Sequence, residues 1–412
     1  MTRQYVIPEG VVKEAWKRVR EKKGAEGVDG QTIEDFEKDL EDNLYKIWNR
    51  MTSGSYFPPA VRAVEIPKKT GGKRILGVPC VSDRIAQTVC KMYIEPLVEP
   101  KFHPDSFGYR PGRSQHHALA QTRKRCWKFD WVLEIDIRGY FDNIPHERTL
   151  ELVKNYTTEK WILLYIERWL KAKIQQKDGS LENREKGSPQ GSVVSPILSN
   201  IYLHHAFDTW MQVSHGEAPF ERFADDIVVH CESLDEAINL RKEISQRLNN
   251  WGLEINEGKT RIVYCKDSNR NGQYDQTEFT FLGYTFRPRR SNNNKTGVTF
   301  TNFLPAISQE ASSEISERMR EWHLSKRTSA TIELLSHDIN PEVRGWLQYY
   351  GKLYPSALRD IIRQLDNHIL RWALQKYKRL KQSTIRGKRW LDGISTRQPR
   401  LFAHWVWRAS SC

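Results

Sequence analysis

The sequence predicts an α+β fold in which a strand-rich middle is followed by a helix-rich end. Short apolar segments with the two-residue alternation of strands recur between residues 61 and 286. Beyond residue 297 the apolar spacing becomes helical as far as about residue 380. The last part of the chain is strongly basic. We therefore expect a mixed body, a helical domain and a short basic C-terminal segment.

The expected elements follow from local patterns in chain order. Residues 8–50 indicate two amphipathic helices, separated by the turn-rich segment 22–30. The segment KKTGGKR is typical of a hairpin turn between two strands. A break is expected at Asn340-Pro341, because proline cannot donate a helical hydrogen bond. The other segments are helices at 81–100, 146–175 and 234–251, strands at 61–67, 131–137, 261–265 and 279–286, and a strand-turn-strand at 220–231.

The charge of the chain indicates a polyanionic partner. The 412 residues include 65 Lys and Arg against 51 Asp and Glu, a formal charge of +14. Residues 361–412 hold 12 of these cations and two acids. Cations interleaved with aromatic rings fit nucleic acid, whereas the alternative is a solvated helix face over ordinary core tryptophans. The aromatic residues in question are Trp372, Tyr377, Trp390, Phe402, Trp405 and Trp407.

Composition also argues against several classes of protein. No run of 18 apolar residues exists, so we expect no membrane partner. The six cysteines form no CxxC pair, which argues against a zinc ribbon or a disulfide framework. The N-terminal segment has no apolar signal-peptide core. Together these features predict a cytoplasmic protein in a reducing compartment.

Acids inside two apolar strands are the strongest chemical signal. Asp136 lies in LEIDIRGYFDNI, and Asp225 and Asp226 lie in RFADDIVVH. Such acids are costly unless something neutralises them, and carboxylates prefer hard cations such as Mg²⁺. Two Mg²⁺ ions held by acids on neighbouring strands suit in-line phosphoryl transfer. A tight turn with solvated acids is the alternative.

A segment rich in small residues lies between the two acidic sites. GSPQGSVVSPILSN spans residues 187–200, and a helix is expected to start at Ser195-Pro196, where proline suits the first turn. Gly191 and Ser192 would let a backbone or a nucleotide approach closely. Asp136, the PQG of residues 189–191 and the pair Asp225-Asp226, in this order along the chain, form a specific combination of motifs.

These motifs resemble the reverse transcriptase-maturase proteins encoded by bacterial group II introns, from about residue 20 to 405. The sequences DIRGYFDNI, SPQGSVVSPILSN and FADD are similar to three palm motifs of that family. Further similar segments are GAEGVDG (24–30), VEIPKKTGGKRILGVPCVSDRIAQ (64–87), FHPDSFGYRPGRSQHHAL (102–119), GLEINEGKT (252–260), FTFLGYTF (279–286), INPEVRGWLQYYG (339–351) and RQPRLFAHW (397–405). FADD stands where the family usually has YADD, and SPQGS where TPQGG is commoner.

The resemblance implies a right-hand polymerase. Its parts would be an N-terminal extension with fingers over 1–120 and a palm with an antiparallel sheet over 121–300. An all-helical thumb, the maturase domain X, would cover 301–380, and a basic DNA/RNA-binding tail 381–412. An HNH-type endonuclease domain is not expected, since no cysteine pairs with a following His/Asn cluster appear.

The resemblance also implies residue roles. Asp136, Asp225 and Asp226 would be catalytic and would bind two Mg²⁺, joined by the backbone carbonyl of Ile137. The residues implied for the dNTP are Lys68, Arg74, Phe141, Gln190 and Lys259. The residues implied for template and primer are Gly191, Phe281, Leu282, Gly283, Arg344 and Lys352.

Plainer interpretations remain open for many of these residues. Lys68 and Arg74 could be surface cations, Phe141 and its neighbour Tyr140 core aromatics, and Lys259 a helix C-cap cation. Residues 281–283 could form a plain strand. The apolar and aromatic residues of RGWLQYYG (Trp346, Leu347, Tyr349 and Tyr350) are interpreted mostly as packing, with Arg344 and Lys352 facing nucleic acid.

The function that the resemblance implies is RNA-directed DNA synthesis combined with splicing assistance. The partners would be the parent group II intron RNA, an RNA template with a DNA primer, and target DNA, in the bacterial cytosol or nucleoid. The chain would assist splicing and retrohoming of its own intron. One alternative is a free-standing, domesticated reverse transcriptase in DNA repair or phage defence. Another is a catalytically idle RNA-binding splicing cofactor, against which the retained acids argue.

Overall fold

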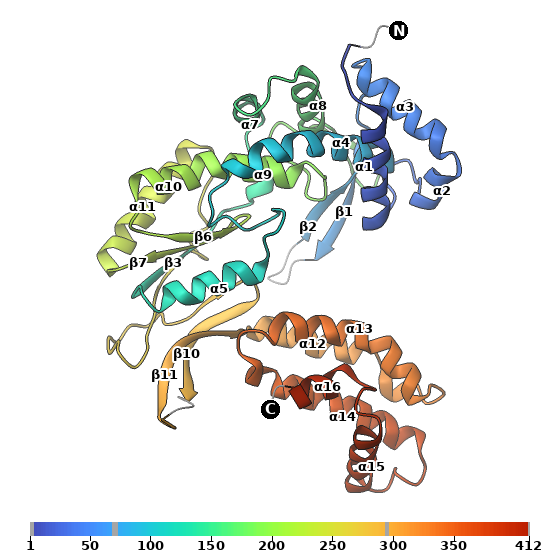
Figure 1. The fold of residues 1–412 in the computed structure, drawn as a ribbon, viewed down its shortest axis with the longest axis vertical. Coiled ribbons are helices and arrows are strands. Elements are labelled where there is room, and N and C mark those ends of the chain that lie inside the picture. The colour runs from blue at the N-terminus through green and yellow to red at the C-terminus, as the bar shows by residue number, and fades with distance from the viewer. Residues whose placement is uncertain (1–3, 68–72, 293–295, 411–412) are drawn as a thin grey trace. The chain divides into compact units, whose positions relative to one another are not determined.

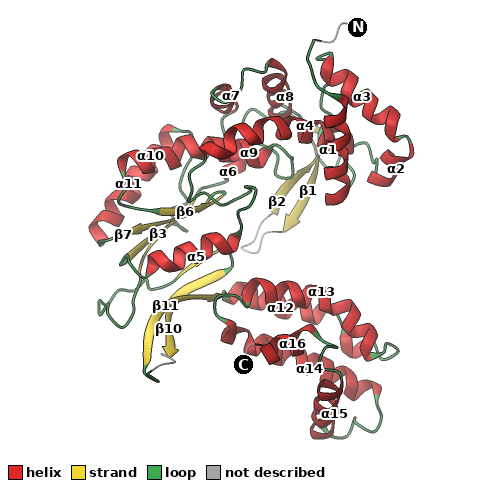
Figure 2. Cartoon of the chain, viewed as in Figure 1, coloured by secondary structure: helices red, strands yellow, loops and turns green. Residues whose placement is uncertain are grey.

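The chain folds into two compact units in the computed structural model, which describes residues 4–67, 73–292 and 296–410. The first unit comprises residues 1–122 and 131–262, and the second comprises residues 123–130 and 263–412. Figure 1 follows the chain through its elements, and Figure 2 shows strands grouped among helices. The predicted α+β class is confirmed. None of the described helices is both long enough and apolar enough to cross a membrane.

The first unit is built from helices around two small sheets. One sheet has the strand order β2-β1-β4-β5, and the other has the order β6-β7-β3-β8. The helices are α1 (Glu9–Lys22), α2 (Ile33–Lys38), α3 (Leu40–Thr52), α4 (Val81–Val98), α5 (Gln115–Cys126), α6 (Tyr140–Asn143), α7 (His146–Lys154), α8 (Lys160–Leu170), α9 (Ser195–Leu203), α10 (Thr209–Ser214) and α11 (Leu234–Asn250). The end of α5 continues into the second unit. The strands are β1 (Val61–Pro67), β2 (Lys73–Val78), β3 (Trp131–Asp136), β4 (Ile174–Gln175), β5 (Leu181–Glu182), β6 (Phe220–Phe223), β7 (Asp226–Cys231) and β8 (Arg261–Tyr264), the last of which continues into the second unit.

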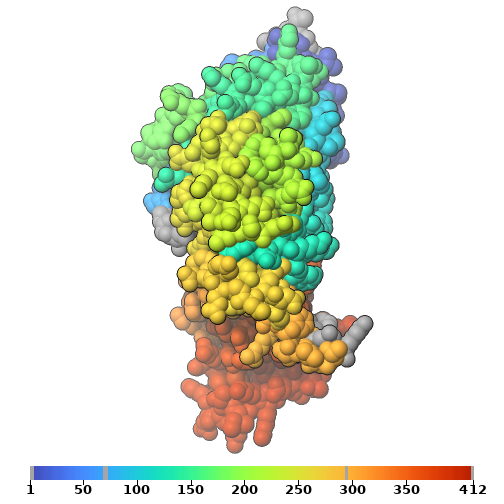
Figure 3. All heavy atoms as spheres, turned by 90° about the vertical axis from the view of Figure 1, so that its left-hand side faces the viewer, coloured from blue at the N-terminus to red at the C-terminus, as the bar shows by residue number. Residues whose placement is uncertain are grey.

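Buried apolar residues fix the sheet that carries the acids. Leu133 and Ile135 of β3 and Ile227 to Val229 of β7 are almost fully buried. α11 packs against both strands and covers one face of this sheet. Figure 3 shows the outer side of this layer, where the yellow-green atoms of α10 and α11 reach the surface. The buried apolar residues of these strands thus include those that pack under α11.

The second unit joins a twisted hairpin to a helical bundle. Its three-stranded sheet has the order β11-β10-β9. Its elements are β9 (Phe279–Phe281), β10 (Tyr284–Asn292), β11 (Thr299–Ile307), α12 (Gln309–Glu321), α13 (Ile332–Tyr350), α14 (Arg359–Lys376), α15 (Thr384–Arg397) and α16 (Ala403–Ser410). Residues of all five helices form one apolar core. Ser308 and Thr331 cap α12 and α13 with their side-chain oxygens, which explains where these helices begin.

Three predictions of single helices or strands were wrong in the same way: each predicted element is two or more separate elements in the structure. Residues 8–50 contain three helices, since Asp39 leaves the helical conformation between α2 and α3. Residues 146–175 contain α7, α8 and then the short strand β4. Residues 279–286 are two strands, β9 and β10, joined by a turn at Leu282-Gly283. Turn geometry and long-range pairing, which periodicity does not report, set these boundaries.

The prediction that helices begin after residue 297 was also wrong. β11 covers Thr299–Ile307 and pairs antiparallel with β10 along its whole length. The start of the segment expected to be an all-helical thumb is therefore a strand. The alternation in TFTNFLPAI is weak, and only pairing with β10 makes it a strand.

The predicted break at Asn340-Pro341 does not occur either. α13 continues through Pro341 from Ile332 to Tyr350. The lost helical hydrogen bond is offset nearby, because the Asn340 side chain donates to Leu401 O (2.9 Å) and accepts from Ala403 N (2.9 Å). These bonds anchor α13 to the start of α16, and tertiary contact outweighs the proline penalty.

The basic end of the chain packs as helices in the second unit. Trp372, Phe402 and Trp405 are buried members of the apolar core. Tyr377, Trp390 and Trp407 are partly buried against it. The three buried rings are therefore core residues, as the alternative interpretation of the sequence proposed. Only the three partly exposed rings could stack on nucleic-acid bases.

Candidate active site

The two acidic segments lie side by side in the first unit. β3 and β7 pair antiparallel, with Asp136 directly opposite Asp226. Directly opposite residues share a sheet face, with Cβ atoms about 5 Å apart. Asp225 precedes Asp226 in the turn between β6 and β7. The three aspartates expected to be catalytic thus gather at one end of the sheet.

A buried charged cage holds the turn that carries the acid pair. The Arg222 guanidinium donates two bonds to the Asp208 carboxylate (2.7 and 2.6 Å), and neither side chain is exposed. Arg222 also donates to Ala224 O (3.0 Å), inside the turn, and to Asn200 Oδ1 (3.1 Å). Burial alone would raise the pKa of Asp208, but the charge and hydrogen bonds of Arg222, together with His204, outweigh burial and hold the pKa below its usual value. The cage fixes a turn whose Ala224 has a φ of +58°.

A glycine lets a second segment reach the same turn. A Cβ on Gly108 would lie 2.4 Å from Ala224 N, so only glycine fits there. Asn200 Nδ2 donates to Gly108 O (2.8 Å), which ties this segment to the cage. The cage residues escaped the sequence analysis, although charged residues within the apolar stretch FERF were a signal that could have indicated them.

The electrostatics of the acid cluster are unfavourable without a cation. Burial raises the pKa of Asp225, and the charge of Asp136 adds to the shift. The pKa of Asp226 is raised to about 7, first by crowding that displaces water and then by the charges of Asp225 and Asp136. The Asp226 side chain nevertheless reaches solvent, so a ligand has access to it. Neighbouring carboxylates that hinder one another's ionisation indicate a site for positive charge.

The donor set fits Mg²⁺ by its chemistry. Carboxylate oxygens from neighbouring strands are the ligands that Mg²⁺ prefers, and a bound cation would favour the charged form of each acid. Among the described residues, no group of three or more His, Cys, Asp or Glu side chains has the geometry of a preformed metal site. Ile137, whose carbonyl was expected to help, is buried beside Asp136 and bridges to Ile255.

Two of the residues expected to bind the nucleotide meet one another. The Arg74 Nε donates to Gln190 Oε1, and the Arg74 charge reaches Asp225 and Asp226. Arg74 lies on β2, which pairs antiparallel with β1, as expected for a hairpin. Lys68 lies outside the described residues. The structure brings Arg74 and Gln190 to the acid cluster, and their role remains a prediction.

Gly191 is required by the backbone that surrounds it. Its φ is +116°, and a Cβ there would lie 2.7 Å from Gly77 O. The neighbouring Gln190 O accepts from Gly77 N (2.8 Å). The close approach expected at Gly191 is thus made by strand β2 of the same chain. A role in binding the template is not tested by this contact.

A buried glutamine clamps the other side of this loop. Gln87 Oε1 accepts from Ser192 Oγ (2.6 Å) and Val193 N (2.7 Å). Its amide nitrogen donates to Asp83 (2.8 Å), which is itself buried. Ser192 was expected to lie open to close approach, but its hydroxyl is buried and bonded to Gln87. The clamp was not predicted, because residues 87 and 192 are distant in the sequence.

The carboxylate behind the clamp is buried among hydrogen-bond donors. Asp83 Oδ1 accepts from Tyr56 Oη (2.9 Å) and from Trp169 Nε1 (2.7 Å). Burial raises the pKa of Asp83 to about 6, and the donors only limit that shift. Through Asp83 and Gln87, α4 is therefore joined both to α8 and to the loop of residues 187–194.

Aromatic side chains line the approach to the acids. Phe141 is buried and makes an edge contact with Tyr109, with the ring centroids 6.5 Å apart. The Tyr109 ring also contacts Phe223, and its pKa is raised by burial and by Asp225. Tyr140 is a core residue whose hydroxyl donates to Ser199 O (2.6 Å). Sequence reasoning missed Tyr109, although it lies in the quoted segment FGYRPG.

Lys259 lies beside the acid cluster. Its Nζ is 3.5 Å from Asp136 Oδ1, and about half of its side chain is exposed. It lies in the turn of residues 257–259 and not at a helix end, so the interpretation as a helix C-cap is wrong. Proximity to the nucleotide remains a prediction.

The remaining template and primer candidates lie in the second unit. Phe281 is buried in the core, whereas Leu282 and Gly283 form the turn between β9 and β10. Tyr349 Oη donates to Leu282 O (2.8 Å), so α13 supports this turn. The side chains of Arg344 and Lys352 are exposed. Contact with a primer thus stays a prediction for the turn and the two cations, while Phe281 serves the core.

The apolar and aromatic residues of RGWLQYYG mostly pack, as expected. Leu347 is buried, Trp346 stacks on Trp322 at 5.4 Å, and Tyr350 packs against the helical core. Their helical spacing reflects the buried face of α13.

Comparison with known proteins identifies the family. The family described as "Reverse transcriptase (RNA-dependent DNA polymerase)" matches residues 66–286, and "Group II intron, maturase-specific domain" matches residues 312–390. Group II intron-encoded protein LtrA of Lactococcus lactis subsp. cremoris is 32% identical over 437 residues, which cover 84% of this chain and 70% of LtrA. Protein YkfC of Escherichia coli is 30% identical over 318 residues, covering 67% of this chain and 79% of YkfC.

A eukaryotic relative matches a shorter part. The putative COX1/OXI3 intron 2 protein of Saccharomyces cerevisiae is 28% identical over 274 residues, covering 61% of this chain and 31% of that protein. The chain therefore belongs to the group II intron reverse transcriptase/maturase family.

Proposed function

We propose that this chain is an active RNA-directed DNA polymerase that also binds its parent group II intron RNA to assist splicing and retrohoming. The observation that carries the polymerase half is the pairing of Asp136 with Asp226 on adjacent strands, with Asp225 in the next position. Family membership supports the same reaction class, and the retained acids argue against an idle site.

Each residue of the site has a part in the proposed reaction. Asp136, Asp225 and Asp226 would hold two Mg²⁺ ions together with the Ile137 carbonyl. Bound Mg²⁺ supplies charge that activates the primer 3′-hydroxyl and stabilises the leaving pyrophosphate. The Arg74 guanidinium, held by Gln190, orients the dNTP triphosphate, and Lys259 adds positive charge. Phe141 restricts the space for a ribose 2′-hydroxyl.

The proposed division into parts has the same order as the chain. Residues 1–120 would act as N-terminal extension and fingers, 121–300 as palm, 301–380 as thumb and 381–412 as a nucleic-acid-binding segment. The template strand would run past Gly191, and the primer past Leu282, Gly283, Arg344 and Lys352. Target DNA would be a third partner.

Primer extension by an Asp225→Asn/Asp226→Asn variant tests the polymerase half. Extension of a DNA primer on an RNA template in Mg²⁺ should fall by about a thousandfold or more, since the ligands supply several kcal/mol of transition-state stabilisation. Glu232→Gln/Asp235→Asn is the matched control, because it removes two exposed acids beyond the other end of β7. Full extension by the acid-site variant would refute the assignment of the metal site.

Crosslinking in the native cells tests the splicing half. The RNA bound to the protein is recovered and sequenced, with the acid-site variant as a parallel sample. One long structured RNA that contains this reading frame is expected for both proteins, because RNA binding needs no catalytic acid. Scattered, unrelated RNAs would instead indicate a free-standing reverse transcriptase.

A further inference from the structure

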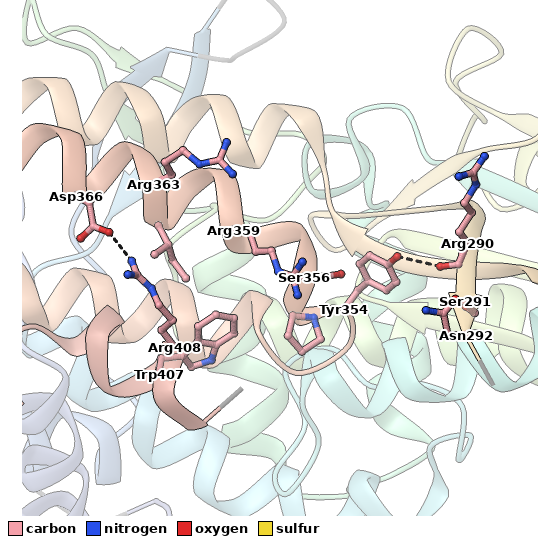
Figure 4. A pocket seen from close by; sticks show the side chains of 12 residues that line it. Arg290, Ser291, Asn292, Tyr354, Ser356, Arg359, Arg363, Asp366, Trp407 and Arg408 are labelled. Carbon is pink, nitrogen blue, oxygen red and sulfur yellow. Dashed lines mark hydrogen bonds and ion pairs between the residues drawn. The ribbon is translucent and has the colours of Figure 1, made fainter. Parts of the chain in front are cut away.

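A cavity of ≈ 970 Å³ lies within the second unit, between β10 and the start of α14. Its walls come from the β10 residues near Arg290, from the turn before α14 and from the end of α16. Tyr354 Oη donates to Arg290 O (3.2 Å), which ties the hairpin to the helices at the edge of the cavity. Figure 4 shows these elements converging on the cavity. None of the residues assigned above to the acids, the nucleotide or the primer lines it.

The walls carry an excess of positive charge. Four arginines line the cavity against one acid, Asp366. Asp366 is fully engaged, since it accepts from His404 Nε2 (2.9 Å), Trp405 Nε1 (3.0 Å) and Arg408. The charge of the Asp366 carboxylate is therefore compensated by these donors, and the carboxylate holds Arg408 in place. Figure 4 shows this ion pair at one side of the cavity.

The other cations of the cavity are available to a ligand. Among the described residues no carboxylate pairs with Arg290 or Arg359, and Arg363 has only the solvent-exposed Asp360 (3.1 Å). Arg359 is the first residue of α14, where the partial positive charge of the helix end adds to its own. Such an arrangement fits phosphate groups.

Aromatic rings accompany these cations. Tyr354 and Trp407 line the cavity and are partly exposed. In the view of Figure 4, the Arg359 guanidinium lies between the two rings. A ring next to a phosphate-binding cation suits a nucleotide, whose base can stack while its phosphate is paired. A paired base inside a duplex could not reach a ring in this way.

We propose that this cavity binds single-stranded RNA, with an unpaired base against Tyr354 or Trp407 and the adjoining phosphates on Arg359 and Arg363. The proposal rests on the proposed function in one respect, namely that an RNA strand is a partner of this chain. It adds a binding site that is separate from the acid cluster. The site selects an unstacked nucleotide rather than a duplex.

Salt-dependent binding tests the cations. An unstructured, fluorescein-labelled RNA of about 12 nucleotides, within the reach of a single-strand site, is titrated with the full chain. Arg359→Gln/Arg363→Gln should weaken binding by about tenfold and lower the slope of log K against log salt by about 1.4, or about 0.7 for each of two contacts. Arg371→Gln on the same helix is the matched control, since it is exposed and lies outside the cavity. Equal behaviour of the pocket variant and the control would overturn the proposal.

Substitutions of Tyr354 test the ring. Tyr354→Leu should weaken binding about fivefold without changing the salt slope, because stacking releases no counterions. Tyr354→Phe keeps the ring and should bind as the wild type does. If Tyr354→Leu binds RNA as tightly as Tyr354→Phe does while the arginine variant binds it more weakly, the cavity contacts only the RNA phosphates. The claim that a base stacks on Tyr354 is then refuted.

Competitors and primer extension separate the remaining outcomes. Unlabelled duplex RNA and AMP should both compete poorly; strong competition by the duplex refutes the single-strand claim, and strong competition by AMP assigns the cavity to a free nucleotide. Primer extension by the pocket variants should match that of the wild type. If the pocket variants extend a primer and bind RNA as the wild type does, this inference alone is overturned. If the wild-type chain itself binds no RNA, the splicing half of the proposed function is overturned as well.

Discussion

Two tight hairpin turns, one in each unit, are held in different ways. In the first unit, Ala224 and Asp225 join β6 to β7, and buried charges surround the turn. In the second unit, Leu282 and Gly283 join β9 to β10, with φ values of +51° and +76° that fit a type I′ turn. There a tyrosine hydroxyl bonds Leu282 O, and no buried ion pair among the described residues supports the turn.

The contrast follows from what each turn carries. A turn that presents acids in a crowded, poorly hydrated place gains from a fixed cation behind it, which Arg222 provides. A neutral turn needs only hydrogen bonds and steric fit. We therefore expect the first turn to be more rigid, and the loss of its support to be far more costly.

The largest effect is expected from Arg222→Met. This change leaves the buried Asp208 without its arginine partner, which should lower the free energy of unfolding by about 3–5 kcal/mol. Urea unfolding measures the loss. Adding Asp208→Leu should restore much of it, because the double variant buries no lone charge. A loss below 1 kcal/mol, on the order of a surface pair, would remove the contrast between the two turns.

The pH dependence of stability should reveal Asp83, another buried carboxyl group of the first unit. Its pKa of about 6 in the folded chain exceeds the ordinary value, so the folded state binds the extra proton. The free energy of unfolding contributed by Asp83 is complete below about pH 4 and is lost as the pH rises through 6, by about 3 kcal/mol. Unfolding of the wild type and Asp83→Asn is compared from pH 4 to 7. A constant difference between them would contradict the assignment.

An intermediate effect is expected from the clamp on the loop of residues 187–194. Gln87→Leu leaves the Ser192 hydroxyl and the Val193 N–H without their acceptor, at a cost of about 1–3 kcal/mol. The loop that carries Gln190 should loosen, so the KM for dNTP should rise about tenfold with a smaller change in kcat. Ser192→Ala removes only one donor and should have a weaker effect. Unchanged KM with lower stability would make the clamp merely structural.

The smallest effect is expected at the neutral turn. Tyr349→Phe removes one hydrogen bond to Leu282 O and should lower the free energy of unfolding by about 1 kcal/mol. Tyr350→Phe is the control, because its hydroxyl makes no hydrogen bond within the described residues. Thermal unfolding of both variants provides the comparison. A loss at Tyr349 as large as that at Arg222 would show that both turns depend equally on their polar supports.

Much of the site could be predicted from the sequence, because its acids stand out locally. Asp136 and the pair Asp225-Asp226 interrupt apolar strands, and the structure indeed sets β3 beside β7. The hairpin near Arg74 and the helix beginning near residue 234 were also predicted from the sequence. These features depend on neighbours within a few residues, which is the range that pattern reading covers.

The predictions that were wrong concern elements whose structure depends on residues far away in the chain. The strand β11 exists because β10 lies beside it, and Pro341 stays within α13 because Asn340 holds the start of α16. The cavity lined by Arg359 brings together residues from 290 to 408. No local pattern encodes such pairings, since burial and closure decide them together.

The sequence by itself determined the family, the order of its motifs and the acids that would bind metal. Only the tertiary structure decided what holds those acids in place: the Arg222–Asp208 cage, the Gln87 clamp and the glycine contact at Ala224. A buried polar group must find its partner wherever the fold provides one, because leaving it unpaired costs several kcal/mol. Candidate catalytic residues can therefore be identified from residue types. The interactions that hold these residues in place depend on which distant segments the fold brings into contact.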